Sequence, residues 1–324
     1  MRRPCSRPSG LLPLLLLATA GFGQETIRVD VHLINVTFSV LDAQGGFVHN
    51  LGQDDFDVWE DNVPQRIAFF AHASEIPLHL GLAADFSGSQ VNSIKPHHKD
   101  LETFLKTVVS PRDDVFLLCF ASRLRLAQDV TADPRLITQG LDDFEQYRKG
   151  KGNFHPNRFP ELGPHEIRPP STDTAFFDAV YESVRLKLSD AQTGRRALVI
   201  FSDGDDNSSA RDEVEAIEIA QRNDVVLFCV RYTETGKDGA VTARNKNGTT
   251  VLERMAHDSG GAHFNARDKG LAEHFRQIGD QLRSSYELAY HTTNPVSDGS
   301  FRKIAIRAKR AGLTVRAKSG YVAR

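Results

Sequence analysis

Two different periods of apolar residues divide this chain. Between about residues 24 and 75, apolar and polar positions alternate, as in the run 34–40, and this alternation predicts β-strands. From Pro77 onwards, uninterrupted apolar runs alternate with segments whose apolar residues recur every three or four positions. After Ser285 the alternation returns to every second residue. The pattern therefore predicts a β segment, an α/β segment and a second β segment.

The middle segment has the pattern of a doubly wound α/β domain. Its apolar runs are short and uninterrupted, which is typical of strands that are buried on both faces of a mostly parallel sheet. Apolar residues at helical spacing lie between them and predict amphipathic helices. The predicted strands cover 78–84, 115–121, 197–201 and 225–230. The predicted helices lie around 101–108, 134–147, 176–184, 214–220 and 271–282.

The two terminal β segments, 24–75 and 284–324, are each too short to bury much apolar surface alone. Turn signals at 42–46 and 61–62 separate the strands of the first segment. We expect the two segments to pack together as one small sandwich-like domain. The α/β domain, residues 76–283, is then inserted between them.

The composition fits this organisation and excludes one class of partner. The chain has 324 residues, of which 40% are hydrophobic and 25% charged, enough for one large domain and a smaller one. The formal net charge is only −2. A strong basic excess would be expected of a nucleic-acid-binding protein, so nucleic acid is excluded as the main partner.

Residues 1–23 have the layout of a signal peptide. Arg2, Arg3 and Arg7 precede an apolar run at 11–20, and small residues follow. The run is too short for a bilayer core, which requires about 20 apolar residues. Cleavage after Ala20 or after Gly23 fits the pattern, and Gly23 is favoured. The mature protein is then expected to be secreted or periplasmic, with no membrane span.

Hydroxyl and carboxyl side chains follow two of the predicted strands. The strand at 78–84 runs directly into Asp85, Ser87 and Ser89, and the strand at 197–201 runs into Asp203. In doubly wound sheets, ligands bind outside the carboxyl ends of the strands. Hard oxygen ligands of this kind suit Mg²⁺, Mn²⁺ or Ca²⁺. With few carboxylates around it, such an ion would seek an acidic ligand from elsewhere.

These residues resemble the metal-ion-dependent adhesion site of von Willebrand factor A domains. The family pattern is Asp-x-Ser-x-Ser, then a Thr that opens a helix, then an Asp after the fourth strand. Asp85, Ser87 and Ser89 match the first part and Asp203 the last. The resemblance implies that the serines, and often the threonine, contact the metal directly, while the aspartates act partly through water. One coordination position remains for an acidic residue of a protein partner.

The threonine of the pattern is assigned by its distance from a following alanine. The segment 172–179 resembles the bacterial sequence Gly-Gly-Thr-Ala-Leu-Tyr-Asp-Ala. Counting back five positions from Ala179 selects Thr174 rather than Thr172 as the metal ligand. The two glycines of the pattern are absent here. The predicted metal ligands are therefore Asp85, Ser87, Ser89, Thr174 and Asp203.

The flanking segments resemble a narrower group, the von Willebrand factor A-related family of secreted bacterial proteins first noted in acidobacteria. The segment 51–62, which contains Asp-Phe-Asp-Val-Trp-Glu-Asp-Asn, is similar to the segment before their A domain. The ending at 301–321 is also similar to theirs. The family is defined by its architecture, so this resemblance names no partner.

The resemblance also implies the sheet order 3-2-1-4-5-6, which bears on the cysteines. Cys5 is removed with the signal peptide, and Cys119 and Cys229 lie in apolar strand-like runs. The order places them three strands apart, at about 4.8 Å per strand. Since a disulfide requires Cα atoms within about 7 Å, we expect two buried, free thiols.

Four further polar residues lie close to the predicted ligands in the sequence. Asp178 is interpreted as a structural anchor for loops rather than a metal ligand. Asp205, Asp206 and Asn207 are interpreted as a polar loop that caps the helix starting near Arg211. A second ion in this loop is the alternative.

The sequence thus favours a cation-dependent binding module, not an enzyme. A metal-assisted hydrolase is the first alternative, but it needs a positioned base, and the motifs provide no His or Glu at a fixed offset from the ligands. In the second alternative the metal site is vestigial and the protein is a structural interaction protein. The identity of the partner and the oligomeric state do not follow from the sequence.

Overall fold

The structure, a computed structural model, describes most of the chain. The described residues are 33–72, 76–90, 94–155, 157–163, 173–189, 194–232, 243–267 and 270–324. The predicted signal peptide, 1–23, lies outside these residues. No helix within the described ranges is long and apolar enough to cross a lipid bilayer.

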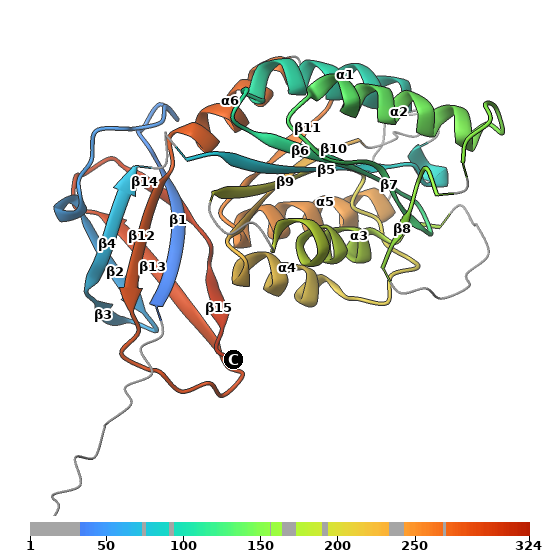
Figure 1. Cartoon of the computed structure of the whole chain (residues 1–324). Helices are drawn as coiled ribbons and strands as arrows, with labels where there is room; N and C mark the ends of the chain where they lie inside the picture. Colours follow the sequence, from blue (N-terminus) through green and yellow to red (C-terminus); the bar gives the residue numbers. More distant parts are fainter. Residues whose placement is uncertain are drawn as a thin grey trace, which may run out of the picture. The chain divides into compact units, whose positions relative to one another are not determined.

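Both ends of the chain build one β domain from two antiparallel sheets (Figure 1). One sheet has the order β14-β1-β12-β4 and the other β15-β13-β2-β3. Their strands are β1 (Leu33–Leu41), β2 (Phe56–Glu60), β3 (Val63–Gln65), β4 (Ile67–His72), β12 (Tyr286–His291), β13 (Phe301–Ala308), β14 (Thr314–Ala317) and β15 (Gly320–Val322).

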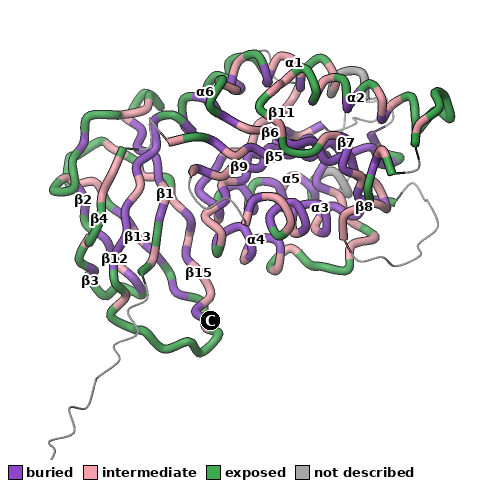
Figure 2. The backbone as a smooth tube through the Cα atoms, in the orientation of Figure 1, coloured by how far each residue is buried: buried purple, intermediate pink, exposed green. Residues whose placement is uncertain are grey.

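The pairing of these strands confirms that the two terminal segments form one sandwich-like domain. In the first sheet Val36 lies opposite Leu288, and in the second Val58 lies opposite Ile306. Alternate residues of both sheets point inward and form one buried core around Phe38. The buried positions of these strands are visible in Figure 2.

The inserted segment forms a seven-stranded sheet with the order β11-β10-β9-β5-β6-β7-β8. Its strands are β5 (Leu78–Asp85), β6 (Asp114–Phe120), β7 (Leu124–Thr131), β8 (Glu161–Leu162), β9 (Arg195–Ser202), β10 (Val225–Arg231) and β11 (Ala262–Asn265). β7 and β8 are antiparallel to their neighbours, and the other pairs are parallel. Apart from the edge strand β8, this is the order 3-2-1-4-5-6. The predicted fold class is therefore confirmed; the domain boundaries stay predictions.

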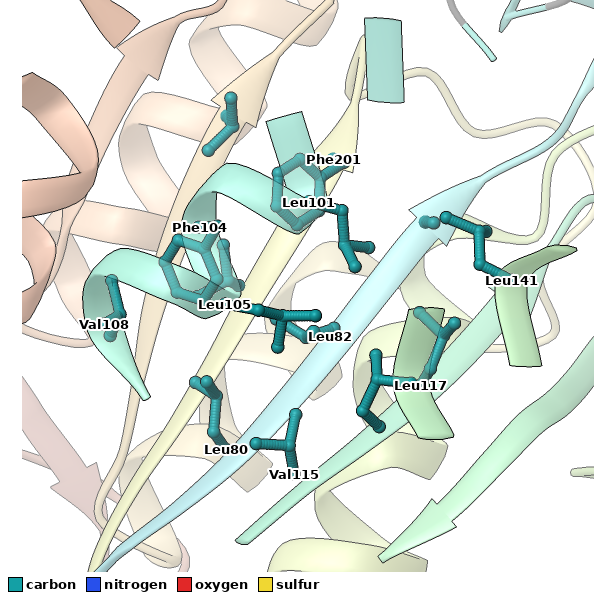
Figure 3. Packing of buried hydrophobic residues seen from close by; sticks show 14 of the residues in the cluster. Leu80, Leu82, Leu101, Phe104, Leu105, Val108, Val115, Leu117, Leu141 and Phe201 are labelled. Carbon is teal, nitrogen blue, oxygen red and sulfur yellow. The ribbon is translucent and has the colours of Figure 1, made fainter. Parts of the chain in front are cut away.

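Helices cover both faces of this sheet (Figure 1). One face is covered by α1 (Ile94–Val108), α2 (Pro134–Arg148) and α6 (Leu271–Arg283), and the other by α3 (Phe176–Ser183), α4 (Glu213–Arg222) and α5 (Ala243–Asp258). Figure 3 shows part of the first core, where Leu82 of β5 lies between Phe104 of α1 and Leu117 of β6. Because strands buried from both sides must be apolar throughout, the uninterrupted runs in the sequence indicated them correctly.

Four elements of the α/β domain were not predicted, namely β7, β8, α5 and β11. α5 carries few apolar residues, and Gly248 with two β-branched threonines interrupts its pattern. β11 has only four residues. The prediction for the cysteines is confirmed: Cys119 in β6 and Cys229 in β10 are buried and free, with β9 and β5 between their strands.

Candidate metal centre

Asp85 ends β5 at the carboxyl edge of the sheet, where its side chain is fully buried. Its Oδ1 accepts a hydrogen bond of 2.8 Å from the backbone N–H of Ser87. Its Oδ2 accepts a bond of 2.6 Å from the hydroxyl of Ser202, the last residue of β9. The carboxylate thus fixes the turn that follows β5 and joins the ends of two adjacent strands.

The two serines of the motif lie side by side on this turn. Ser87 Oγ and Ser89 Oγ are 3.1 Å apart, and Ser87 is almost completely buried. The next residue, Gln90, is buried and donates a bond of 3.2 Å from Nε2 to the carbonyl of Tyr232, just after β10. The backbone N–H of Phe86 donates to the carbonyl of Phe120 at the end of β6. The loop is therefore held to the strands on both sides.

Asp203 directly follows β9 and is also buried. Its Oδ1 accepts a bond of 3.1 Å from the backbone N–H of Asp205. The chain then turns at Gly204, which has a φ of 78°, and packs directly on Gly248 of α5. A Cβ atom at Gly248 would lie 2.2 Å from the carbonyl oxygen of Asp203. Only glycine permits this close approach, so α5 sets the position of the second carboxylate.

Thr174 lies just before α3 and is held by the loop that follows Asp203. Its backbone N–H donates a bond of 2.7 Å to Asn207 Oδ1, and its carbonyl accepts from the backbone N–H of Asn207 at 3.0 Å. The next residue, Ala175, donates to the carbonyl of Ala121 beyond the end of β6. Thr174 is thereby fixed between the end of β6 and the Asp203 loop.

The polar loop at 205–207 does not have the predicted role. Asp212, not one of these residues, caps α4. Asp206 instead accepts backbone N–H bonds from Phe176 and Phe177 at the start of α3, at 2.7 and 3.3 Å. The reason is that the chain passes over the start of α3 before it enters α4, so the first free backbone donors that the loop meets belong to α3.

Asp178 anchors a loop, as predicted. Its carboxylate accepts backbone N–H bonds of 2.9 Å from both Ala210 and Arg211. The loop and the start of α3 are therefore tied together in both directions. Sequence reasoning missed two residues that hold the predicted ligands, Ser202 and Asn207. The only signal for Ser202 was its place before Asp203.

The charge of Asp203 disturbs the ionisation of Asp85. Burial, together with the nearby charge of Asp203, raises the pKa of Asp85 from 3.8 to about 7, although hydrogen bonds from Ser202 and Ser87 oppose the rise. Two adjacent buried carboxylates without a counter-charge are unfavourable when both are ionised. A cation between them would remove this cost.

The oxygen atoms available here fit a hard divalent cation. Within the described part of the chain, Thr174 Oγ1 is buried without a hydrogen-bond partner. Such an atom is costly unless a ligand contacts it. No group of three or more His, Cys, Asp or Glu side chains suited to a metal occurs among the described residues. The predicted ligands offer two carboxylates and three hydroxyls, a set that suits Mg²⁺, Mn²⁺ or Ca²⁺.

The strand order of the seven-stranded sheet is that of a von Willebrand factor A-like fold. No protein-family model and no curated protein matches the sequence. Similar solved structures include a von Willebrand factor type A protein from Catenulispora acidiphila, with 12% identity, a TM-score of 0.46, and coverage of 91% of this chain and 75% of that chain.

Two further solved structures are similar to this chain. BatB from Bacteroides thetaiotaomicron has 13% identity and a TM-score of 0.42, and the match covers 63% of this chain and 98% of that chain. Proximal thread matrix protein 1 from the mussel byssus, with a zinc-occupied metal-ion-dependent adhesion site, has 13% identity, a TM-score of 0.45, and coverage of 69% and 50%. Since these scores are low, the fold rests on the strand order alone.

Proposed function

We propose that this protein is a secreted or periplasmic module that captures an acidic group of a protein partner through a bound divalent cation. The ligands are Asp85, Ser87, Ser89, Thr174 and Asp203, and the cation is Mg²⁺, Mn²⁺ or Ca²⁺. When bound, the cation supplies a positive charge that accepts a carboxylate of the partner. The protein is then a binding module and not an enzyme.

Two observations support this proposal: the two buried carboxylates at the ends of adjacent strands, and the buried, unpaired hydroxyl of Thr174, whose backbone is bonded to the loop after Asp203. The pKa of Asp85 is raised to about 7 by burial and by Asp203, and Thr174 Oγ1 has no hydrogen-bond partner among the described residues. A cation would satisfy the hydroxyl and neutralise the carboxylates together. With only two carboxylates, it would keep some positive charge and thereby favour an acidic ligand from outside.

The secretion in this proposal is supported by the leader-like residues before Gln24. The cysteines are also compatible with an oxidising compartment. The two cysteines of the mature chain are both fully buried and separated by two strands, so neither is exposed to oxidation or able to pair with the other. Sequencing the N-terminus of the exported protein tests this part, with Gln24 expected as the first residue.

A peptide array tests the binding function. Each peptide carries one Glu or Asp, and a twin carries Gln or Asn at the same position. We expect a subset of acidic peptides to bind in Mg²⁺, and their amide twins and all peptides in EDTA to remain unbound. The Asp85→Ala variant should lose binding, whereas Asp54→Ala, a change at an exposed carboxylate of the β domain, should retain it.

Two results would contradict the proposal. Equal capture in Mg²⁺, in EDTA and by Asp85→Ala would show that the cation has no role. Failure of every acidic peptide to bind in Mg²⁺, with protein that is shown to bind the ion, would show that the site does not capture carboxylates.

A further inference from the structure

A cavity lies at the end of the α/β sheet opposite to the candidate metal centre. It has a volume of about 450 Å³ and is located where β5, β6 and β9 begin, at the amino ends of the strands. Three guanidinium groups line it, those of Arg112, Arg195 and Arg283. Among the described residues that line it, Asp113 is the only acidic one. The cavity therefore has an excess of two positive charges and no part in the metal centre.

The one carboxylate of the cavity is already occupied by neutral donors. Asp113 Oδ1 accepts a bond of 3.0 Å from the backbone N–H of Leu78. Its Oδ2 accepts two bonds of 2.8 Å from the N–H and the hydroxyl of Ser110. Asp113 thus orders the loop before β6 through bonds to neutral donors.

Arg195 brings an unsatisfied donor to the cavity. The residue is only 9% exposed. Its Nη2 donates a bond of 2.7 Å to the carbonyl of Ile76, and its Nε donates to the same oxygen at 3.2 Å. Its Nη1 is buried and has no hydrogen-bond partner within the part of the chain that the structure describes. Because a guanidinium stays charged, this donor requires an acceptor, which the protein does not provide.

The arginines also repel each other. Burial lowers the pKa of Arg195, Asp113 partly offsets the effect, and the charge of Arg283 lowers the pKa further. Arg283 is held in place by a bond of 2.8 Å from its Nη1 to the carbonyl of Val108, at the end of α1. Arg112 is exposed at the rim. The like charges of Arg195 and Arg283 are thus held close together beside the cavity.

We propose that this cavity binds a tetrahedral oxyanion, namely the phosphate group of a small phosphorylated molecule. Planar guanidinium groups suit phosphate oxygens because they donate two parallel hydrogen bonds. A phosphate would supply the acceptor that Arg195 Nη1 lacks and would balance the charge of Arg112 and Arg283. The cavity is much larger than the roughly 30 Å³ of one water molecule, so it also has room for part of the group that carries the phosphate.

Calorimetric titration of the full mature chain with sodium phosphate tests this proposal. EDTA is present throughout, and sodium chloride and sodium acetate at matched ionic strength are the reference anions. We expect saturable heat with phosphate and none with chloride or acetate. Glycerol 3-phosphate in a parallel titration distinguishes a phosphate ester from the free ion: tighter binding of the ester is expected.

Matched variants locate the binding. Arg112→Gln and Arg283→Gln should each weaken phosphate binding about tenfold, as expected for one charge-assisted hydrogen bond. Arg310→Gln, at an exposed position of the β domain, should leave it unchanged. Arg195 is kept, because its bonds to Ile76 hold the start of β5. Asp85→Ala should bind phosphate normally, which separates this site from the metal centre.

Three outcomes would overturn the proposal. Absence of phosphate heat in the unaltered protein would exclude the site. Equal weakening by Arg310→Gln would show a general charge effect, and acetate binding as tight as phosphate binding would exclude a tetrahedral ligand. Thermal unfolding of each variant without phosphate confirms that a loss of binding is not a loss of fold.

Discussion

Replacing Asp85 by Asn should stabilise the metal-free protein, although it removes a predicted ligand. In the folded chain the pKa of Asp85 is raised from its ordinary value of 3.8 to about 7 by burial and by Asp203. A raised pKa means that the stability linked to this group is complete below pH 4 and is lost as the pH rises through 7. At about 1.4 kcal/mol per tenfold change in proton affinity, the full loss is about 4 kcal/mol.

The effect can be isolated by comparing two pH values. Between pH 5 and pH 8 the linkage relation predicts that metal-free wild-type protein loses about 2 to 3 kcal/mol of stability through Asp85 alone. Asp85→Asn does not titrate, so it should lose this much less over the same interval. Its amide oxygen can retain the bond from Ser87, and its NH₂ group can donate to Ser202 Oγ, whose own hydroxyl proton loses its acceptor.

Urea unfolding in EDTA at pH 5 and pH 8 measures this difference. Asp54→Asn, at an exposed carboxylate, is the control and should follow the wild type. With Mg²⁺ added at pH 8, the wild type should gain stability in proportion to the logarithm of the ion concentration, and Asp85→Asn should not. The same pH dependence of stability for the wild type and Asp85→Asn in EDTA would contradict the raised pKa of Asp85.

Three further predictions concern the residues around the site. Thr174→Ala should leave the stability against urea in EDTA unchanged or slightly higher, because the lost hydroxyl has no partner among the described residues. The same variant should abolish Mg²⁺ binding in calorimetry, whereas Thr174→Ser should retain it. Gly248→Ala should lower stability by about 1–3 kcal/mol and weaken Mg²⁺ binding, because the new methyl group would displace Asp203, whereas Gly52→Ala, in open space, should do neither. Asn207→Ala should weaken Mg²⁺ binding about tenfold, because it releases the N–H of Thr174, and Asn207→Asp should restore the affinity. Unchanged Mg²⁺ affinity in all of these variants would contradict the described geometry.

Much of the fold could be predicted because its strands are buried in different ways. The central strands, such as β5, are covered on both faces, and between its ends β5 is therefore apolar without interruption, at positions 80–84. Strands of the β domain, such as β13, are buried on one face and alternate. The turn at Asp61 and Asn62, with φ of 48° and 67°, was indicated by residue types that tolerate this conformation.

The missed elements lie where local pattern is weak and tertiary contact decides. α5 contains Gly248, which disfavours a helix when considered locally, but the close contact with Asp203 requires it. The ligands themselves could be proposed because they follow strands that end at one edge of the sheet. The residues that hold them, Ser202 and Asn207, act through hydrogen bonds between distant segments, and sequence spacing does not reveal such bonds.

An anomalous difference map from a crystal soaked in Mn²⁺ would test directly whether the predicted ligands hold a divalent cation. We expect one strong peak at the carboxyl edge of the sheet, within about 2.5 Å of the hydroxyls of Ser87 and Ser89 and beside Asp85 and Asp203. A peak elsewhere on the protein, or no peak at this edge when the site is open to solvent, would contradict this expectation.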